Sequence, residues 1–227
     1  MTLTPRRGHD DHLVGHTEVS AQRLGRMAAD GAALSATSME GASRAGSTGA
    51  SGHAPMSRAN RGNEMATSDI LREQLLALID GHGAHLPFDA AVADFPDDAI
   101  NRLPPNVPYT PWHLLEHIRI AQRDILDYIR NREYLAPNWP EEYWPGRDAT
   151  ATPEQFALTV EGFRTDRTAL HELVADPATD LLGTIPNTPG HTVLREVRLV
   201  ADHNAYHVGE FAILRQVMGT WPPGRNE

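Results

Sequence analysis

Two histidines near the C-terminal end of the chain stand at a spacing that suits metal binding. His203 and His207 lie four residues apart within ADHNAYHVGE, residues 201–210. On a helix, this spacing places both side chains on one face, one turn apart, so both imidazoles can reach the same metal ion. An isolated pair of this kind is more often two packed histidines with ordinary hydrogen bonds. The spacing alone leaves both interpretations open.

A metal site needs at least one more ligand, and WHLLEH, residues 112–117, supplies candidates. His117 recurs at helical spacing with the apolar residues of this segment, so we expect it on the buried face of a helix. His113 falls at the edge of that face, and we interpret it as a solvated residue at the start of the helix. Glu116 points away. The sequence therefore predicts a site built from His117, His203 and His207.

The same segment also matches H-x-x-E-H, a pattern of inverted zinc proteases, through His113, Glu116 and His117. That chemistry requires both histidines and the glutamate to face one ion together. It would leave His203 and His207 unused, so we favour the three-histidine arrangement.

Several neighbouring residues could assist such a site. Glu210 lies one turn beyond His207 and could be a fourth ligand, a partner of a ligand or a general base, and we select it as the candidate catalytic residue. A surface glutamate is the plain alternative. Asn204 could form a hydrogen bond across the protein, whereas we expect Asp202 either to be exposed or to support a metal ligand from behind. The aromatic segment 134–144 either covers the site or simply connects two helices.

Four long helices are expected to carry these residues. Apolar periodicity indicates a helix from about residue 68 to Ile79, a second from Thr110-Pro111, a third from Thr152-Pro153 and a fourth over 193–218. Threonine followed by proline is typical of a helix start, and Gly219 of a helix end. No segment predicts a strand convincingly. The chain is thus expected to be all-α, an antiparallel four-helix bundle with a long connection over 82–110 that permits a crossover.

On the fourth helix, we expect a broad buried arc centred on the two histidines. One flank of this arc is formed by Val200, Asn204, Phe211, Leu214 and Met218, and the other by Leu199, Tyr206, Ile213 and Val217. Burial of both flanks would place the histidine pair inside the bundle.

The first 66 residues differ in composition from the rest. Residues 28–53 are dominated by Ala, Gly, Ser and Thr, a composition that buries too little apolar surface to offset its chain entropy. We therefore expect residues 1–66 to be a disordered tail and residues 67–227 to form the folded domain. Translation from Met56 or Met65, which would make the tail an artefact of gene annotation, is the alternative.

Composition limits the classes of function. The chain has no cysteine, which excludes disulfides, thiolate ligands and a cysteine nucleophile. Its net charge of −10 disfavours nucleic acid and anionic membranes as partners. No apolar run approaches the ~20 residues that span a bilayer. We expect a cytoplasmic protein acting on a small molecule.

Two segments together resemble the signature helices of the DinB-like superfamily: WHLLEHIRIAQ, residues 112–122, and DHNAYHVG, residues 202–209. The segment from Asn138 to Pro145 is similar to one bacterial branch of that superfamily. The resemblance covers roughly residues 68–221. It implies a four-helix bundle of unusual connectivity, often dimeric, in which His117, His203 and His207 hold a divalent metal ion.

Characterised members of this superfamily include transferases and isomerases that use a low-molecular-weight thiol. The resemblance therefore implies a divalent-metal-dependent enzyme, a thiol-dependent transferase or a hydrolase, acting on a small electrophile. Three imidazoles suit zinc, nickel or iron. A non-catalytic stress-response protein that binds metal or a small ligand is the alternative. The chain departs from the usual pattern at Glu210, where glutamine is common, and at His113.

Overall fold

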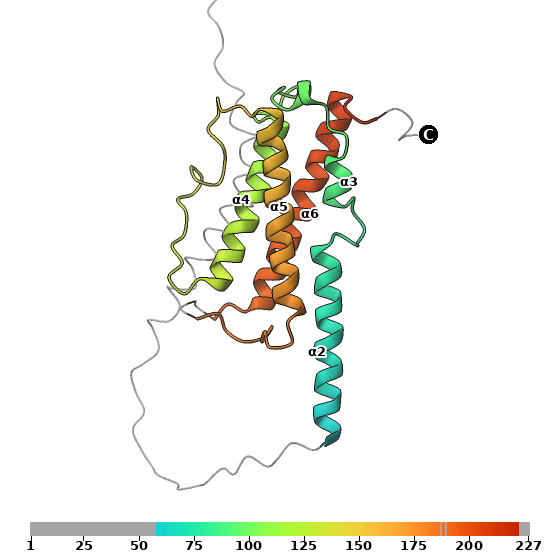
Figure 1. The fold of residues 1–227 in the computed structure, drawn as a ribbon, viewed down its shortest axis with the longest axis vertical. Helices are drawn as coiled ribbons and strands as arrows, with labels where there is room; N and C mark the ends of the chain where they lie inside the picture. Colours follow the sequence, from blue (N-terminus) through green and yellow to red (C-terminus); the bar gives the residue numbers. More distant parts are fainter. Residues whose placement is uncertain (1–57, 187, 189, 223–227) are drawn as a thin grey trace, which may run out of the picture. The chain divides into compact units, whose positions relative to one another are not determined.

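The computed structural model of the chain describes residues 58–222 apart from 187 and 189, and of residues 58–66 the backbone alone. The helices are α2 (Arg58–Ile79), α3 (Phe88–Val92), α4 (Pro111–Arg130), α5 (Pro153–Ala175) and α6 (Val193–Met218), with a short 3-10 helix, η1 (Asp97–Ala99). Within these described ranges, the only β-type pairing is an isolated bridge between Thr184 and Thr192. The all-α expectation is confirmed (Figure 1).

The helix ends follow the local sequence. Thr110 and Thr152 cap α4 and α5 through capping boxes, each followed by proline at the first helical turn. Thr192 caps α6, and Gly219 ends it in the left-handed conformation at φ 64°, which glycine adopts without steric cost. The predicted starts at Thr110 and Thr152 and the predicted span 193–218 are thus confirmed.

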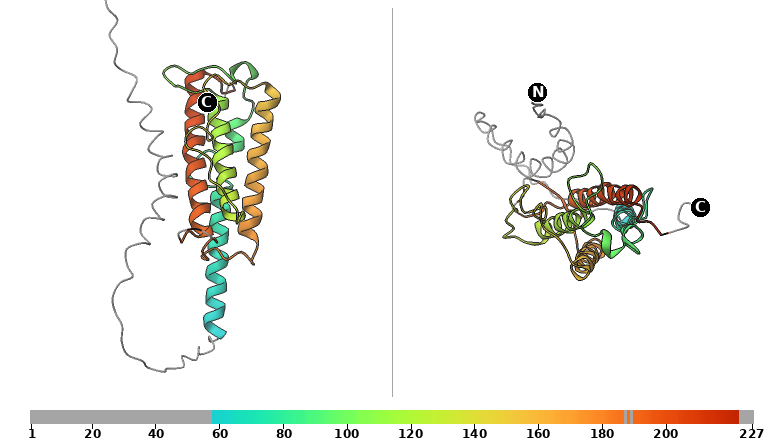
Figure 2. Two further views of the ribbon diagram at one scale, coloured as in Figure 1. Left: turned by 90° about the vertical axis from the view of Figure 1, so that its left-hand side faces the viewer. Right: turned by 90° about the horizontal axis from the view of Figure 1, so that it is seen from above.

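The helices α4 and α5 run parallel, side by side, and not antiparallel as the sequence suggested (Figures 1 and 2). Their starts lie at the same end of the bundle, where Asn101, shortly before α4, exchanges two hydrogen bonds with the backbone of Ala151, just before α5. A parallel pair needs a connection as long as the helices themselves. Residues 131–152 provide it, returning along the side of the bundle.

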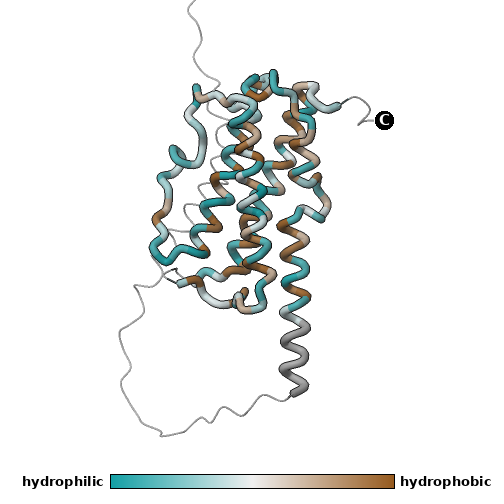
Figure 3. The backbone as a smooth tube through the Cα atoms, in the orientation of Figure 1, coloured by the Kyte–Doolittle hydropathy of each residue, from teal (hydrophilic) through white to brown (hydrophobic). Residues whose placement is uncertain are grey.

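The remaining neighbours complete the bundle. α4 packs against α5 and α6, α2 packs against the same two helices, and α3 packs on α6. Apolar and polar residues intermingle along each long helix, as expected of helices that bury one face (Figure 3). Phe88 of α3 stacks on Phe163 of α5 with ring centroids 3.7 Å apart, so the short helix fills the bundle beyond the end of α2.

The backbone of α2 begins at Arg58, ahead of residue 67, where the sequence predicts that the folded domain starts, and residues 1–57 of the predicted tail lie outside the described residues. The division of the chain into tail and domain stays a prediction. On α6, one expected flank of the buried arc is wrong, because Tyr206, Ile213 and Val217 are 53%, 63% and 56% exposed. The helix buries a narrower stripe, which packs mainly against α4, α2 and α3. None of the described helices is both long and apolar enough to cross a membrane.

Candidate metal centre

Three buried histidines meet between α4 and α6. His117 lies within the first two turns of α4, and His203 and His207 project from one face of α6. One ring nitrogen from each lies within 4.8 Å of the other two, and the Nε2 atoms of His117 and His203 are 3.2 Å apart. Two ligands of a tetrahedral ion with metal–nitrogen bonds of about 2.0–2.1 Å lie roughly 3.3–3.4 Å apart. The predicted cluster is present, with a geometry that could hold one metal ion.

Outer contacts fix which nitrogen of two histidines faces the centre. The Nδ1 of His117 lies 2.9 Å from the carbonyl oxygen of Tyr143. A carbonyl oxygen can only accept, so Nδ1 carries the proton and Nε2 keeps its lone pair. The Nδ1 of His207 lies 2.7 Å from Oε2 of Glu210, which orients that ring in the same way. Such acceptors behind ligand histidines are a general feature of metal sites.

The electrostatic environment keeps His117 and His203 neutral. Burial, with a contribution from His207, lowers the pKa of His117 to about 3. Burial also lowers the pKa of His203 well below its ordinary value, and His207 and His117 add to the effect. A metal ligand must be the neutral imidazole, so the environment suits the donor set that an ion requires.

Glu210 does not join the cluster of three ring nitrogens. Its Oε2 contacts Nδ1 of His207 instead. Its other oxygen, Oε1, accepts a hydrogen bond from the hydroxyl of Tyr109. Burial and the neighbouring Glu210 raise the pKa of Tyr109 strongly, so the phenol stays protonated and donates. Of the three roles considered for Glu210, this arrangement matches a partner of a ligand most directly. Its catalytic role stays a prediction.

Aromatic side chains enclose the cluster. Trp144 stacks on His117 with ring centroids 3.9 Å apart and planes 3° from parallel. The exposed Tyr206 meets His207 edge to face at 4.9 Å. Trp144 belongs to the aromatic segment 134–144, so this segment both connects α4 to α5 and covers part of the site.

The other residues singled out from the sequence take structural roles. His113 is 3% exposed, which contradicts the expected solvated position. Its Nδ1 accepts from the backbone of Thr110 to complete the capping box, and its Nε2 lies 2.8 Å from the carbonyl of Ala149. Glu116 pairs with Arg119 and accepts from Thr159, away from the cluster. The H-x-x-E-H residues therefore do not converge.

Two further expectations on α6 are confirmed. The side-chain amide of Asn204 donates to Gln122 of α4 across the bundle at 2.9 Å, and Asp202 is exposed. Sequence reasoning missed Tyr109 and the carbonyl of Tyr143. The aromatic composition of the connection could have pointed to Tyr143, but nothing in the sequence marks Tyr109.

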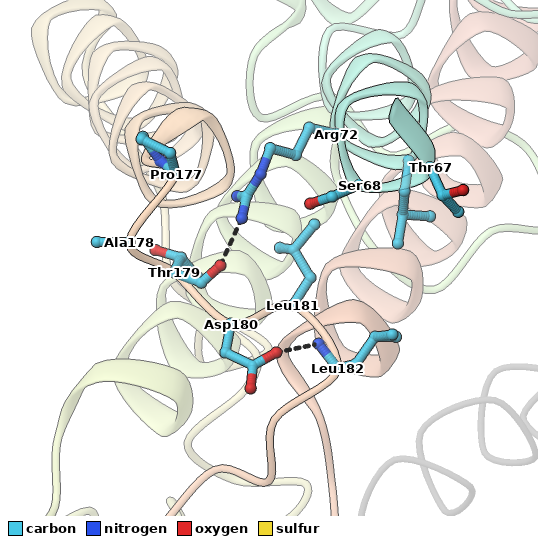
Figure 4. A pocket seen from close by; sticks show the side chains of 10 residues that line it. Thr67, Ser68, Arg72, Pro177, Ala178, Thr179, Asp180, Leu181 and Leu182 are labelled. Carbon is cyan, nitrogen blue, oxygen red and sulfur yellow. Dashed lines mark hydrogen bonds between the residues drawn. The ribbon is translucent and has the colours of Figure 1, made fainter. Parts of the chain in front are cut away.

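A separate groove of about 630 Å³ lies near the C-terminal end of α5, at the opposite end of α4 and α5 from His117 (Figure 4). It is lined by parts of α2 and the turn 177–182. Its one arginine, Arg72, donates to the carbonyl oxygens of Val174, Asp176 and Thr179 at 2.6–2.8 Å. Because this guanidinium holds the turn against α2, we assign the groove a structural origin.

Comparison with known proteins agrees with the site. A sequence model of the DinB superfamily matches residues 87–211, a range that includes all three histidines. No curated protein matches the sequence. No solved structure matches it either.

Proposed function

Because the chain belongs to the DinB superfamily, we propose that it is a metal-dependent enzyme whose ion is held by His117, His203 and His207. We propose zinc, nickel or iron as the metal. The reaction that the site suits best is a thiol-dependent transfer or a hydrolysis on a small electrophile. The single observation that carries this proposal is the convergence of three buried imidazoles. In two of them, His117 and His207, Nδ1 is held by a hydrogen-bond acceptor.

The donor set explains why catalysis is favoured over a purely structural ion. Structural zinc sites are usually closed by four protein ligands, whereas three ligands leave a position for water or substrate. A divalent ion held here would lower the pKa of a bound thiol or water and so supply a nucleophile at neutral pH. The residues of the chain supply the rest. His117 and His207 are oriented from behind, and Tyr206 and Trp144 line the surroundings in which an electrophile would bind.

Glu210 enters the proposal through His207. Both of its oxygens are engaged, one by the imidazole and the other by Tyr109, so it holds the ring in place in the resting protein. A role as proton acceptor would require one of these contacts to open during the reaction.

The first experiment measures bound metal per chain in the full-length protein, purified without a histidine tag. We expect near one divalent ion per chain. The double variant His203→Ala/His207→Ala should bind almost none. The matched control is His82→Ala/His171→Ala, which also removes two histidines but leaves the cluster intact. An unmodified protein that takes up no zinc, nickel or iron would overturn the proposal.

A non-catalytic metal- or ligand-binding role is the second candidate, favoured by the depth of the cluster. His117, His203 and His207 are only 2%, 8% and 2% exposed, and Trp144 lies flat on one of them. Cobalt-substituted protein separates the two roles, because a small thiol that reaches the ion changes the visible absorption bands. A changed spectrum supports the enzyme, and an unchanged spectrum at millimolar thiol supports the non-catalytic role.

A further inference from the structure

Among the contacts between α4 and the connection over residues 131–152, one carboxylate holds two tyrosines. Asp124 of α4 receives two hydrogen bonds from this connection: the hydroxyl of Tyr134 donates to Oδ1 at 2.5 Å, and that of Tyr143 donates to Oδ2 at 2.7 Å. Hydrogen bonds to an ionised acceptor are shorter and stronger than neutral ones. One carboxylate therefore holds two separate points of the connection.

The second of these points leads directly to the metal centre. The backbone carbonyl of Tyr143 accepts from Nδ1 of His117, and the next residue, Trp144, stacks on the same imidazole. The side chain of Tyr143 thus faces Asp124 while its backbone faces His117. The carbonyl that accepts from the His117 ring and the indole that stacks on it therefore come from two consecutive residues of the connection.

We propose that Asp124 is a positioning residue for the metal centre, acting through the tyrosine hydroxyls that hold the Tyr143 carbonyl and the Trp144 ring on His117. Asp124 touches none of the three histidines, so its effect is indirect. The expected effect on metal affinity rests on the proposed function. The expected effect on the position of the His117 ring does not require a bound metal. An acceptor behind a ligand histidine fixes the ring and raises its basicity, and losing one commonly weakens metal binding by about 10- to 100-fold.

The surroundings of Asp124 fit a carboxylate that holds the connection on α4. Burial raises the pKa of Asp124, and the two tyrosine hydroxyls act in the opposite direction by stabilising the carboxylate. Asp127, one turn further along α4, offers a contrast. It pairs with Arg123 at 2.8 Å on the same helix, its side chain is 42% exposed, and the pair does not involve the connection.

The test uses the full chain with Asp124→Ala, Tyr143→Phe and the double variant. Asp127→Ala serves as the control that removes the same charge from the same helix. Zinc affinity is measured by competition with a chromogenic chelator. In the metal-free protein, solvent exchange of the His117 Nδ1 proton is measured by NMR with nitrogen-15 histidine. This second measurement does not depend on a metal.

For Asp124→Ala we expect a zinc dissociation constant raised about tenfold and His117 proton exchange about tenfold faster. Tyr143→Phe should give a smaller change of the same sign without altering any charge. The double variant should match Asp124→Ala, since both changes break one chain of contacts. Asp127→Ala should behave as the parent protein.

Unchanged exchange in both Asp124→Ala and Tyr143→Phe would overturn the inference, as would additive effects in the double variant. If Asp124→Ala fails to fold, Tyr143→Phe decides alone, because it removes only one hydroxyl. A parent protein that binds none of zinc, nickel and iron would count against the proposed function. The exchange of the His117 proton would still decide whether Asp124 holds the connection on the histidine.

Discussion

At the scale of single residues, the site depends on the hydrogen-bond acceptors that hold Nδ1 of His117 and of His207. Glu210 and Tyr109 form a short chain of hydrogen bonds that ends on Nδ1 of His207. Two functions compete for this carboxylate, namely orientation of the imidazole and transfer of a proton. They predict different outcomes for the same substitution.

Replacing Glu210 with glutamine should weaken metal binding by about tenfold, because a neutral amide is a poorer acceptor for His207. Metal affinity and turnover should both be measured. The control is Asp202→Asn, an exposed residue beside the histidine pair, for which we expect no change. A Glu210→Gln protein that keeps its affinity and loses turnover would instead assign the residue to proton transfer.

The histidines should also make stability depend on pH. The folded-state pKa is about 3 for His117 and is well below its ordinary value for His203, while both titrate near 6.5 in an unfolded chain. Below about pH 6.5 the unfolded state therefore binds more protons, and the free energy of unfolding decreases. Their contribution is fully present above that pH and is lost progressively toward pH 3.

Urea unfolding of the metal-free protein between pH 7.5 and pH 5 measures this effect. The free energy of unfolding should fall by up to about 1.4 kcal/mol per pH unit for each such histidine. His203→Gln should flatten the slope, and the exposed His82→Gln should not. Equal slopes in all three proteins would show that burial of His203 does not govern the acid sensitivity.

At the scale of helices, one buried glutamine ties three of them together. Gln122 of α4 is fully buried, its amide donates to the carbonyl of Phe163 of α5 at 2.8 Å, and its oxygen accepts from Asn204 of α6 at 2.9 Å. Since Asn204 directly follows His203, this contact also sets the distance between the two helices that carry the metal ligands.

Replacing Gln122 with alanine should destabilise the protein by about 1–3 kcal/mol, because the Phe163 carbonyl loses one of its hydrogen bonds and the Asn204 amide loses its partner across the bundle. Chemical denaturation measures the change, and the exposed Gln216→Ala on α6 is the control. We also expect weaker zinc binding, as His203 loses its register against His117. A stable Gln122→Ala protein would mean that the helices relax to satisfy both groups.

At the scale of the whole molecule, every described element lies between residues 58 and 222, in the unit that comprises His53–Glu227. A chain that begins at Met56 retains all of these elements. It should therefore bind the same amount of metal as the full chain and unfold at the same temperature. Metal analysis and calorimetry of the two proteins test this, and a loss of stability in the shorter chain would give residues 1–55 a structural role.

Local sequence determined the helices, because their signals act within a single turn. Thr110, Thr152 and Gly219 mark helix ends through contacts with residues only a few positions away. The i, i+4 spacing of His203 and His207, together with the apolar periodicity around His117, likewise predicted that the three rings could meet. Such periodicity reports which side of a helix is buried, whatever the helix packs against.

Only the tertiary structure decided which helices run side by side and what stands behind the metal ligands. The parallel arrangement of α4 and α5 depends on the path of residues 131–152, which helical periodicity does not specify. The acceptor for His117 is a backbone carbonyl, which every residue possesses, so no residue type could reveal it. Tyr109, which precedes α4, donates to Glu210 of α6, 101 residues later in the chain. A hydrogen bond between residues so distant in the sequence forms only once the bundle has packed.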